Sequence, residues 1–292
     1  MEHHNALRQI TLALDRVTLT GFSISGLATY IQIPALDVCF DMGEAPLSAL
    51  PLNHIFLTHA HGDHARCLPR HWHLRRMIGI AKPAAYFLPE AIRVGFEGLV
   101  QAEARFEGVP DDAVEMPQFH GLVDGPESVA LPYRKDLRVR AFSVTHSVPS
   151  LGYTILSRKR KLRPEYKDIP GPEIAKLRAA GVDVQYEIDD PQVTFIGDCI
   201  GASLAEQAHI WDSPIVIIEA TFLEPGEQAL AAKKMHTHLS EIAGALEQLG
   251  DRVATKHIVL KHFSMRYGRD EVFAHIASGI PERFRDRIRV LL

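Results

Sequence analysis

Three histidines and one aspartate lie within six residues of one another, directly after a short apolar segment. The segment Ile55–Thr58 has the length of a buried strand, and it is followed by His59, His61, Asp63 and His64. Imidazole nitrogens and carboxylate oxygens are the donors that zinc and neighbouring divalent metals bind in proteins. The spacing of the first two histidines lets both rings reach one ion from an extended loop, and the other two donors can turn towards a second ion. The pattern therefore predicts a metal site.

A small residue, Gly62, lies inside this cluster, and we expect it to allow the tight backbone path that convergence requires. The alternative is a solvated, histidine-rich turn, which is one interpretation of His71-Trp72-His73. So many donors directly after a strand favour the metal site.

Three further strand patterns each end beside a potential ligand. They are Leu137–Thr145 before His146, Gln192–Ile196 before Asp198, and His257–Lys261 before His262. A single histidine or aspartate in such a place more often caps a turn or satisfies a core hydrogen bond. Together with the first cluster, these side chains are expected to converge on one rim of a sheet. A continuous apolar strand, Pro214–Ile218, ends in the same way at Glu219.

The rest of the chain predicts a single α/β domain, because no internal repeat or long linker divides residues 1–292. We expect strands and hairpins over 10–41, helices over 87–105, 172–180, 239–249 and 269–278, and an irregular loop over about 107–132. The remaining histidines without such context are expected to be surface or structural residues: His3, His4, His71, His73, His120, His209, His257 and His275.

Composition limits the classes of protein to consider. Hydrophobic residues make up 46% of the 292 and charged residues 23%, as in ordinary soluble proteins. No run of about eighteen apolar residues could span a membrane, and the polar N-terminus leads into no signal-peptide core. Three scattered cysteines indicate reduced thiols and a cytoplasmic protein. The net charge of −4 gives no global attraction to nucleic acid, so RNA would require a local basic patch.

Further short motifs accompany the histidine cluster in a fixed order. They are Phe40–Gly43, His146–Tyr153, Gly197–Cys199, Glu219–Phe222, His236–Ser240 and His262–Tyr267. Together with Thr58–His64, which has the form HxHxDH, they resemble the tRNase Z (ribonuclease Z) branch of the metallo-β-lactamase superfamily. The first element marks only the superfamily, whereas the H-S-x-P-x-x-G-Y, E-A-T-F and H-F-S-x-R-Y elements are more specific. The resemblance extends from about residue 20 to 270.

The resemblance implies an αββα sandwich of the α/β class with two divalent metal ions, usually zinc and alternatively manganese. Carried over residue by residue, one ion is held by His59, His61 and His146, and the other by Asp63, His64 and His262. The resemblance makes Asp198 the carboxylate that bridges them. Two such ions about 3.5–4 Å apart can share a hydroxide and clamp a phosphodiester.

The resemblance also implies the residues that assist cleavage. Glu219 matches a glutamate that orients a proton-donating histidine, and both His236 and His238 are candidates for that histidine. Asp63 is a candidate catalytic residue as well as a ligand. Asp41 is expected to orient a ligand histidine.

Two groups of residues are candidates for substrate binding. Ser264 and Arg266 could hold a substrate phosphate, although a salt-bridged turn is an equal alternative. The stretch over about 154–190 resembles a shortened form of the arm with which many family members grip tRNA. Its basic residues, including Arg160, Lys161 and Arg163, could contact RNA backbone, or they form a solvated charged loop.

The leading hypothesis is a zinc-dependent endoribonuclease that cleaves precursor tRNA at its 3′ side. The alternative is a hydrolase of the same fold that acts on a small phosphodiester, lactone or thioester, and a binding protein without activity is disfavoured by the intact ligand set. The resemblance also implies a homodimer, with precursor tRNA or another RNA as partner, whereas the lack of a long apolar run predicts no membrane partner.

Overall fold

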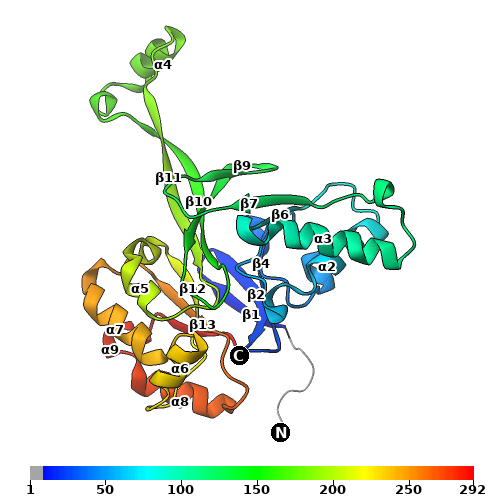
Figure 1. The fold of residues 1–292 in the computed structure, drawn as a ribbon. Helices are drawn as coiled ribbons and strands as arrows, with labels where there is room; N and C mark the ends of the chain where they lie inside the picture. The colour runs from blue at the N-terminus through cyan, green and yellow to red at the C-terminus, as the bar shows by residue number, and fades with distance from the viewer. Residues whose placement is uncertain (1–8) are drawn as a thin grey trace.

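In the computed structural model, which describes residues 9–292, two seven-stranded sheets pack face to face (Figure 1). The first sheet contains, in spatial order, β1 (Ile10–Leu14), β2 (Val17–Ile24), β3 (Ala28–Ile33), β4 (Val38–Phe40), β5 (His54–Phe56), β6 (Ala85–Pro89) and β7 (Gln118–Leu122). The second contains β14 (Ile288–Val290), β13 (His257–Lys261), β12 (Ile215–Glu219), β11 (Gln185–Phe195), β10 (Leu151–Leu162), β9 (Arg134–Ser143) and β8 (Val129–Leu131).

Helices cover the outer face of each sheet (Figure 1). On the first sheet they are α1 (Gly62–Ala65), α2 (Leu68–Met77) and α3 (Glu90–Phe106). On the second they are α5 (Ala202–Glu206), α6 (Gln228–Lys234), α7 (Leu239–Leu249), α8 (Arg269–Gly279) and α9 (Glu282–Arg285). The remaining helix, α4 (Gly171–Ala179), lies at the tip of a projecting arm.

Three apolar clusters hold these four layers together. The middle one joins the two sheets, with Phe40 and Phe56 of the first sheet against Tyr153 and Phe195 of the second. The outer clusters join the first sheet to α2 and α3 and the second sheet to α5, α7, α8 and α9. Complete burial of each large side chain stabilises the fold by about 1.5–3 kcal/mol. The expected αββα sandwich is confirmed.

Strand direction brings the ends of several strands to one edge. In the second sheet β11, β12 and β13 run parallel to one another, and β9 has the same direction because both β9 and β11 are antiparallel to β10. β5 of the first sheet ends at the same edge, since Thr58 O accepts a hydrogen bond of 3.0 Å from Leu151 N of β10. The rim that carries the candidate ligands therefore belongs to both sheets, whereas the sequence predicted a rim of a single sheet.

Two expected elements differ in the structure. The irregular loop over 107–132 contains β7 and β8, and the helix over 87–105 begins only at Glu90 because β6 ends at Pro89. Both strands of the loop are short and lie at sheet edges. Their sequences do not alternate between apolar and polar residues. They are strands because β7 pairs with β6 and β8 pairs with β9.

The arm is a two-stranded extension of the second sheet. β9 pairs with β10 only as far as Ser157, whereas β10 and β11 continue to pair to Leu162 and Gln185. Beyond them the chain forms the 3-10 helix η4 (Pro164–Tyr166) and α4. A solvated charged loop was one of two predictions for the basic stretch, and the part of it up to Leu162 is instead strand β10.

No helix in the described range, 9–292, has the length and apolarity needed to cross a membrane.

A glycine at position 43, and not Gly62, provides the close approach that the ligand loop needs. A Cβ at Gly43 would lie 2.0 Å from the carbonyl oxygen of Asp63, whereas one at Gly62 would meet nothing within 4 Å. Gly62 has no positive φ and is the first residue of α1. The expectation for Gly62 is therefore wrong.

Replacing Gly43 with alanine should destabilise the protein by roughly 1–3 kcal/mol, because the new methyl group overlaps the backbone of Asp63. Urea unfolding of the two alanine variants measures this. Gly62→Ala is the matched control and should change the free energy of unfolding by less than about 0.5 kcal/mol. Equal stability of both variants would contradict the prediction.

Candidate metal centre

Donor atoms from neighbouring strand ends meet in three overlapping groups. Two of these groups contain the seven candidate ligands, and the third is Asp198, Glu219, His236 and His262. Within each group, the donor atoms all lie within 4.8 Å of one another. The first group is His59, His61, His146 and Asp198, and the second is Asp63, His64 and His262. The structure thus brings together all seven side chains that the sequence selected as ligands.

Hydrogen bonds fix which nitrogen each ring presents. His146 Nδ1 donates to Met235 O at 2.8 Å, and His64 Nδ1 donates to Asp41 Oδ2 at 2.8 Å. His59 Nδ1 donates to Thr58 Oγ1 at 2.9 Å, since that hydroxyl donates its own proton to Asp41. Each of these rings therefore turns its Nε2 towards the centre. Such outer partners orient ligands in metal sites.

The spacing of the facing nitrogens fits a shared cation. His64 Nε2 lies 3.1 Å from His262 Nε2, and His146 Nε2 lies 3.2 Å from His61 Nδ1. Two nitrogens about 2.0–2.1 Å from one tetrahedral zinc are separated by about 3.3 Å. Two lone pairs at this distance repel unless a proton or a metal ion lies between them.

Asp198 lies between the two groups. Its Oδ2 is 3.3 Å from His64 Nε2 and 3.9 Å from His59 Nε2, and its Oδ1 is 3.5 Å from His262 Nδ1. Although buried, Asp198 Oδ1 and His59 Nε2 have no hydrogen-bond partner among the described residues. Buried polar atoms left in this state are rare. A divalent cation would satisfy both, so the residues fit a metal.

The electrostatics of the centre also favour a cation. Burial alone would lower the pKa of His64, but the carboxylates of Asp198 and Asp41 outweigh it and raise that pKa to about 10. Burial works against ionisation of Asp198, yet His262 and His64 hold its pKa well below the usual range. The negative potential that keeps a proton on His64 attracts a metal ion, which would displace the proton.

Asp41 occupies a strained backbone position. Its φ is 58°, in the left-handed region, and its carboxylate accepts from Thr58 N at 2.8 Å as well as from His64. Asp41 thus orients His64, one of the histidines predicted to be ligands. His262 also has a positive φ, 64°. Strain of this kind is typical of functional sites whose surroundings fix the conformation.

One of the two candidate proton donors lies beside the centre. His236 Nδ1 is 3.2 Å from Glu219 Oε1 and 3.7 Å from Asp198 Oδ2. Burial lowers the pKa of His236, but the charge of Glu219 outweighs this effect and raises it. The Glu219 carboxylate itself accepts from Cys199 N at 2.8 Å and from Thr221 Oγ1.

The other candidate, His238, caps α7. Its Nδ1 accepts from Ser240 N at 3.1 Å, and its Nε2 donates to Glu224 O at 3.0 Å. Its backbone N donates to Glu241 Oε2 at 2.8 Å, which completes a capping box. Both ring nitrogens are thus engaged away from the centre.

The candidate substrate-binding residues lie in two places. Ser264 and Arg266 follow ligand His262, and Arg266 forms an ion pair of 2.7 Å with Glu227. The arm residues Arg160, Lys161 and Arg163 lie at the outer end of β10 and just beyond it, where the arm projects away from the sheets (Figure 1). The structure does not bring the arm residues of this chain to its own metal centre.

Three groups that orient the candidate ligand histidines were not predicted from the sequence. Thr58 and Thr221 bond the Nδ1 atoms of His59 and His262, and both lie inside motifs that had been noted for other residues. The third is the carbonyl of Met235, a backbone group that carries no signal of its own in the sequence.

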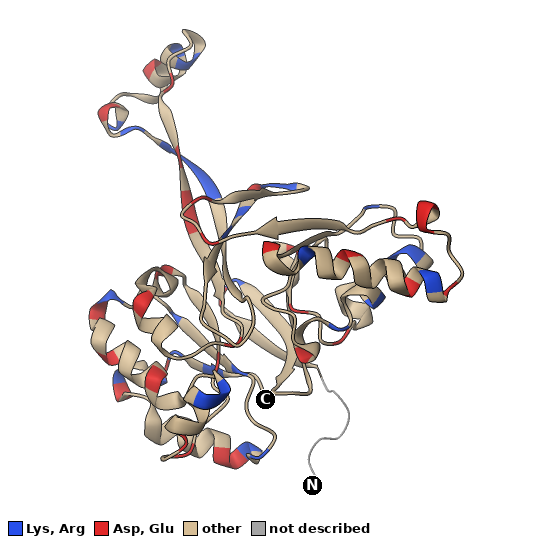
Figure 2. Cartoon of the chain, viewed as in Figure 1, with Lys and Arg blue, Asp and Glu red and all other residues tan. Residues whose placement is uncertain are grey.

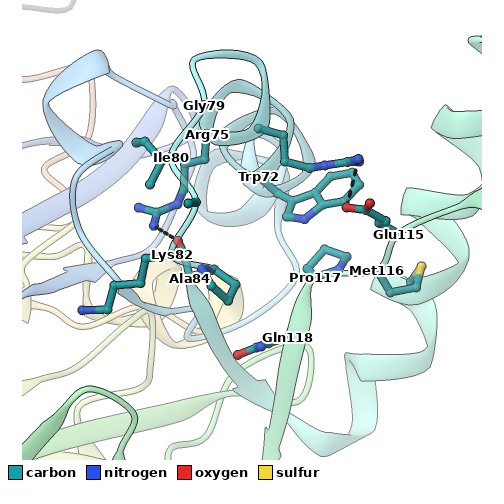
Figure 3. Close-up of a pocket in the computed structure, with 13 residues that line it drawn as sticks. Trp72, Arg75, Gly79, Ile80, Lys82, Ala84, Glu115, Met116, Pro117 and Gln118 are labelled. Atoms are coloured by element: carbon teal, nitrogen blue, oxygen red, sulfur yellow. Dashed lines mark hydrogen bonds and ion pairs between the residues drawn. The ribbon is translucent and has the colours of Figure 1, made fainter.

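A separate cavity of about 340 Å³ lies between α2 and the starts of β6 and β7 (Figure 3). Trp72 and Met116 line it, and Arg76 bridges across it to Glu115 at 2.9 Å. The candidate metal ligands follow the opposite ends of their strands, so this cavity is distinct from the centre.

Comparison with known proteins identifies the family. No protein-family model matches the chain. The tRNase Z TRZ1 of Arabidopsis thaliana is 30% identical over 283 residues, which cover 96% of this chain and 96% of that relative. The chain belongs to the tRNase Z family. The Ribonuclease Z of Thermobifida fusca is a further relative in this family, 29% identical over 270 residues that cover 83% of this chain and 79% of the relative.

Solved structures show the same fold. The short form of human tRNase Z matches with a TM-score of 0.56 at 20% identity, over 84% of this chain and 92% of that one. The metallo-beta-lactamase fold protein YhfI from Bacillus subtilis matches with a TM-score of 0.53 at 12% identity, over 96% and 90% of the two chains. The family and fold implied by the sequence motifs are thereby confirmed.

Replacing Asp41 with asparagine should weaken metal binding about 10–100-fold, because an amide cannot accept from both Thr58 N and His64. Titration of the purified protein with zinc against a chelating dye measures the affinity. Asp37→Asn is the matched control: Asp37 has the same φ of 58°, accepts from a backbone N–H at 2.8 Å and lies beside buried His54. An equal loss of metal affinity in both variants would count against the role of Asp41.

Proposed function

We propose that the chain is a metal-dependent endoribonuclease of tRNase Z type, which hydrolyses precursor tRNA at its 3′ side and leaves a 3′-hydroxyl on the tRNA. The observation that carries this proposal is the pair of adjoining donor groups that meet at Asp198, with His236 and Glu219 beside them. Family membership supports the substrate class, because the relatives are named tRNase Z and Ribonuclease Z.

The proposed cofactors are two divalent ions, zinc first and manganese as the alternative. His59, His61 and His146 would hold one ion, Asp63, His64 and His262 the other, and Asp198 would contact both. When bound, such ions activate water at neutral pH and stabilise the charge that develops on a phosphodiester. The mixture of imidazole nitrogen and carboxylate oxygen suits zinc and its neighbours.

We assign proton donation to His236. Glu219 holds the Nδ1 side of the ring and stabilises the imidazolium form, so Nε2 is free to give a proton to the departing 3′ oxygen of the tRNA ribose. Asp63 is assigned a catalytic part as a proton acceptor for water. Its side chain is 15% exposed whereas that of Asp198 is 2% exposed, so it is the more accessible of the two carboxylates.

His236→Ala should lower kcat for precursor tRNA about 10²–10⁴-fold with metal content unchanged. The same variant should hydrolyse bis(p-nitrophenyl) phosphate at a rate close to that of the unmodified protein, because p-nitrophenolate leaves without needing a proton. Steady-state rates on both substrates and elemental analysis provide the test.

His238→Asn is the matched control, since asparagine is also a good helix cap, and it should retain activity on both substrates. A large loss in His238→Asn and none in His236→Ala would reverse the assignment. Turnover of the small ester by the unmodified protein, with no cleavage of precursor tRNA, would favour the small-ester alternative.

The arm is proposed to contact RNA, as part of a single domain from which residues 154–190 project. Figure 2 shows basic residues along one strand of the arm and acidic residues along the neighbouring strand. Arg163 pairs with Asp183 at 2.7 Å and Arg160 lies 3.4 Å from Glu187, whereas Lys161 has no acidic partner in the described part of the chain. These pairs reduce the positive potential that the arm can present to a phosphate backbone.

The triple variant Arg160→Ala, Lys161→Ala and Arg163→Ala should weaken tRNA binding and lower the slope of log K against log salt by about one to two units, less than three free cations would. Fluorescence anisotropy at several salt concentrations measures both. Alanine at Arg252, Lys256 and Arg283, which lie in the C-terminal part, is the control and should leave both unchanged. An unchanged slope in the arm variant would show that the arm does not touch RNA.

We further propose a homodimer and a cytoplasmic location. The names of two relatives place one in the chloroplast and one in the nucleus, so location varies among the relatives. Both proposals stay predictions for this chain.

A further inference from the structure

One carboxylate, that of Glu227, holds two side chains of the segment that follows ligand His262. Glu227 Oε1 accepts from Arg266 Nη2 at 2.7 Å, and Oε2 accepts from the hydroxyl of Tyr267. The Tyr267 hydroxyl in turn accepts from Leu223 N at 3.0 Å. The side chain of Glu227 is 14% exposed, whereas that of Arg266 is 54% exposed. A half-buried anion thus anchors a cation that faces solvent.

A single short helix connects this carboxylate with the metal centre. Glu227 immediately precedes α6, which has seven residues, and Met235 and His236 immediately follow it. The carbonyl of Met235 accepts from ligand His146. The anchor of Arg266 therefore lies at one end of α6, and the carbonyl that holds His146 and the proposed proton donor His236 lie at the other end.

The guanidinium of Arg266 is fixed but not fully occupied. Its Nε donates to Ser264 Oγ at 3.3 Å, and its Cζ lies 5.6 Å from the centroid of the Phe222 ring. The Phe222 ring lies 6.2 Å from that of His236. In the part of the chain that the structure describes, Arg266 Nη1 has no partner. The free edge of the guanidinium can therefore bind a phosphate without release of Glu227.

We propose that Glu227 is a positioning residue, which holds Arg266 beside the metal centre so that an RNA phosphate next to the cleaved bond meets a guanidinium already in place. This inference rests on the proposed function. Glu227 also neutralises part of the charge of Arg266, yet the ordering effect dominates, because a long and exposed arginine loses much conformational freedom when it binds unaided.

The test is a double-mutant cycle with Glu227→Gln and Arg266→Ala, on the full chain with its metals. Each single change should raise KM for precursor tRNA about tenfold and leave kcat within about twofold, as expected for the loss of one charge-assisted contact made equally in ground and transition states. The double variant should be no worse than Arg266→Ala alone. Bis(p-nitrophenyl) phosphate has no neighbouring phosphate, so the rise in KM should be smaller on this substrate than on precursor tRNA.

Glu224→Gln is the matched control. It removes the same charge from a side chain that is exposed and lies three residues before Glu227 in the sequence. It should leave KM unchanged. Additive effects of the two changes, or a Glu227→Gln variant with unchanged or lower KM, would overturn the inference. So would a fall in kcat on both substrates together with loss of metal, because that pattern is a purely structural defect.

Binding of mature tRNA, measured by anisotropy with the same four variants and intact metals, separates this inference from the proposed function. If the unmodified protein does not cleave precursor tRNA, the proposed function fails, and non-additive losses of tRNA affinity would still support the coupling of Glu227 to Arg266. Full additivity in that measurement, or no loss at all, would overturn the coupling.

Discussion

Buried charge at the junction of two apolar sheets is the constraint on which the site depends. Asp41, Asp198 and Glu219 are at most 1% exposed, and unpaired carboxylates in such places would be very costly. Asp41 and Glu219 are satisfied by backbone N–H groups, threonine hydroxyls and imidazoles from neighbouring strands. Asp198 Oδ1 and His59 Nε2 stay without a partner among the described residues. A divalent ion bound by these donors would therefore also stabilise this edge of the fold and would couple metal loading to folding of the rim.

The apolar layer behind the rim sets the separation of the two donor groups. Phe40 and Phe195 stack with centroids 4.5 Å apart and an angle of 2° between their planes, one from each sheet. The hydroxyl of Tyr153 crosses from the second sheet to donate to Leu57 O of the first at 2.6 Å. Since ligands come from both sheets, any sliding of one sheet over the other would separate them. Dense packing immediately behind the site prevents that movement and keeps the donors preorganised.

Local sequence patterns predicted the elements that carry their own signal. Strand His257–Lys261 and helix Leu239–Leu249 have the predicted bounds, because each is apolar in the correct period and ends at a clear boundary. The candidate ligands were selected because they follow such strands, and the structure brings their donor atoms together. The role of Gly43 and that of the Met235 carbonyl were missed, since both arise where distant segments meet. The short edge strands β7 and β8 were missed for the same reason: pairing with a neighbour, and not residue type, makes them strands.

The arm shows why a run of basic residues is weak evidence for nucleic-acid binding. Between Thr154 and Asp190 the chain has eight basic and seven acidic residues, a net charge of +1. The antiparallel register places the acids opposite the bases, so Arg158 lies 2.9 Å from both Glu187 and Asp189. Exposed pairs of this kind add little stability. Their main effect is to cancel the field at long range, so the arm cannot steer RNA as an unpaired basic strand would. The proposed recognition of RNA by this arm would then depend on shape and on individual contacts made at short distance, where one cation such as Lys161 counts more than the composition of the whole segment.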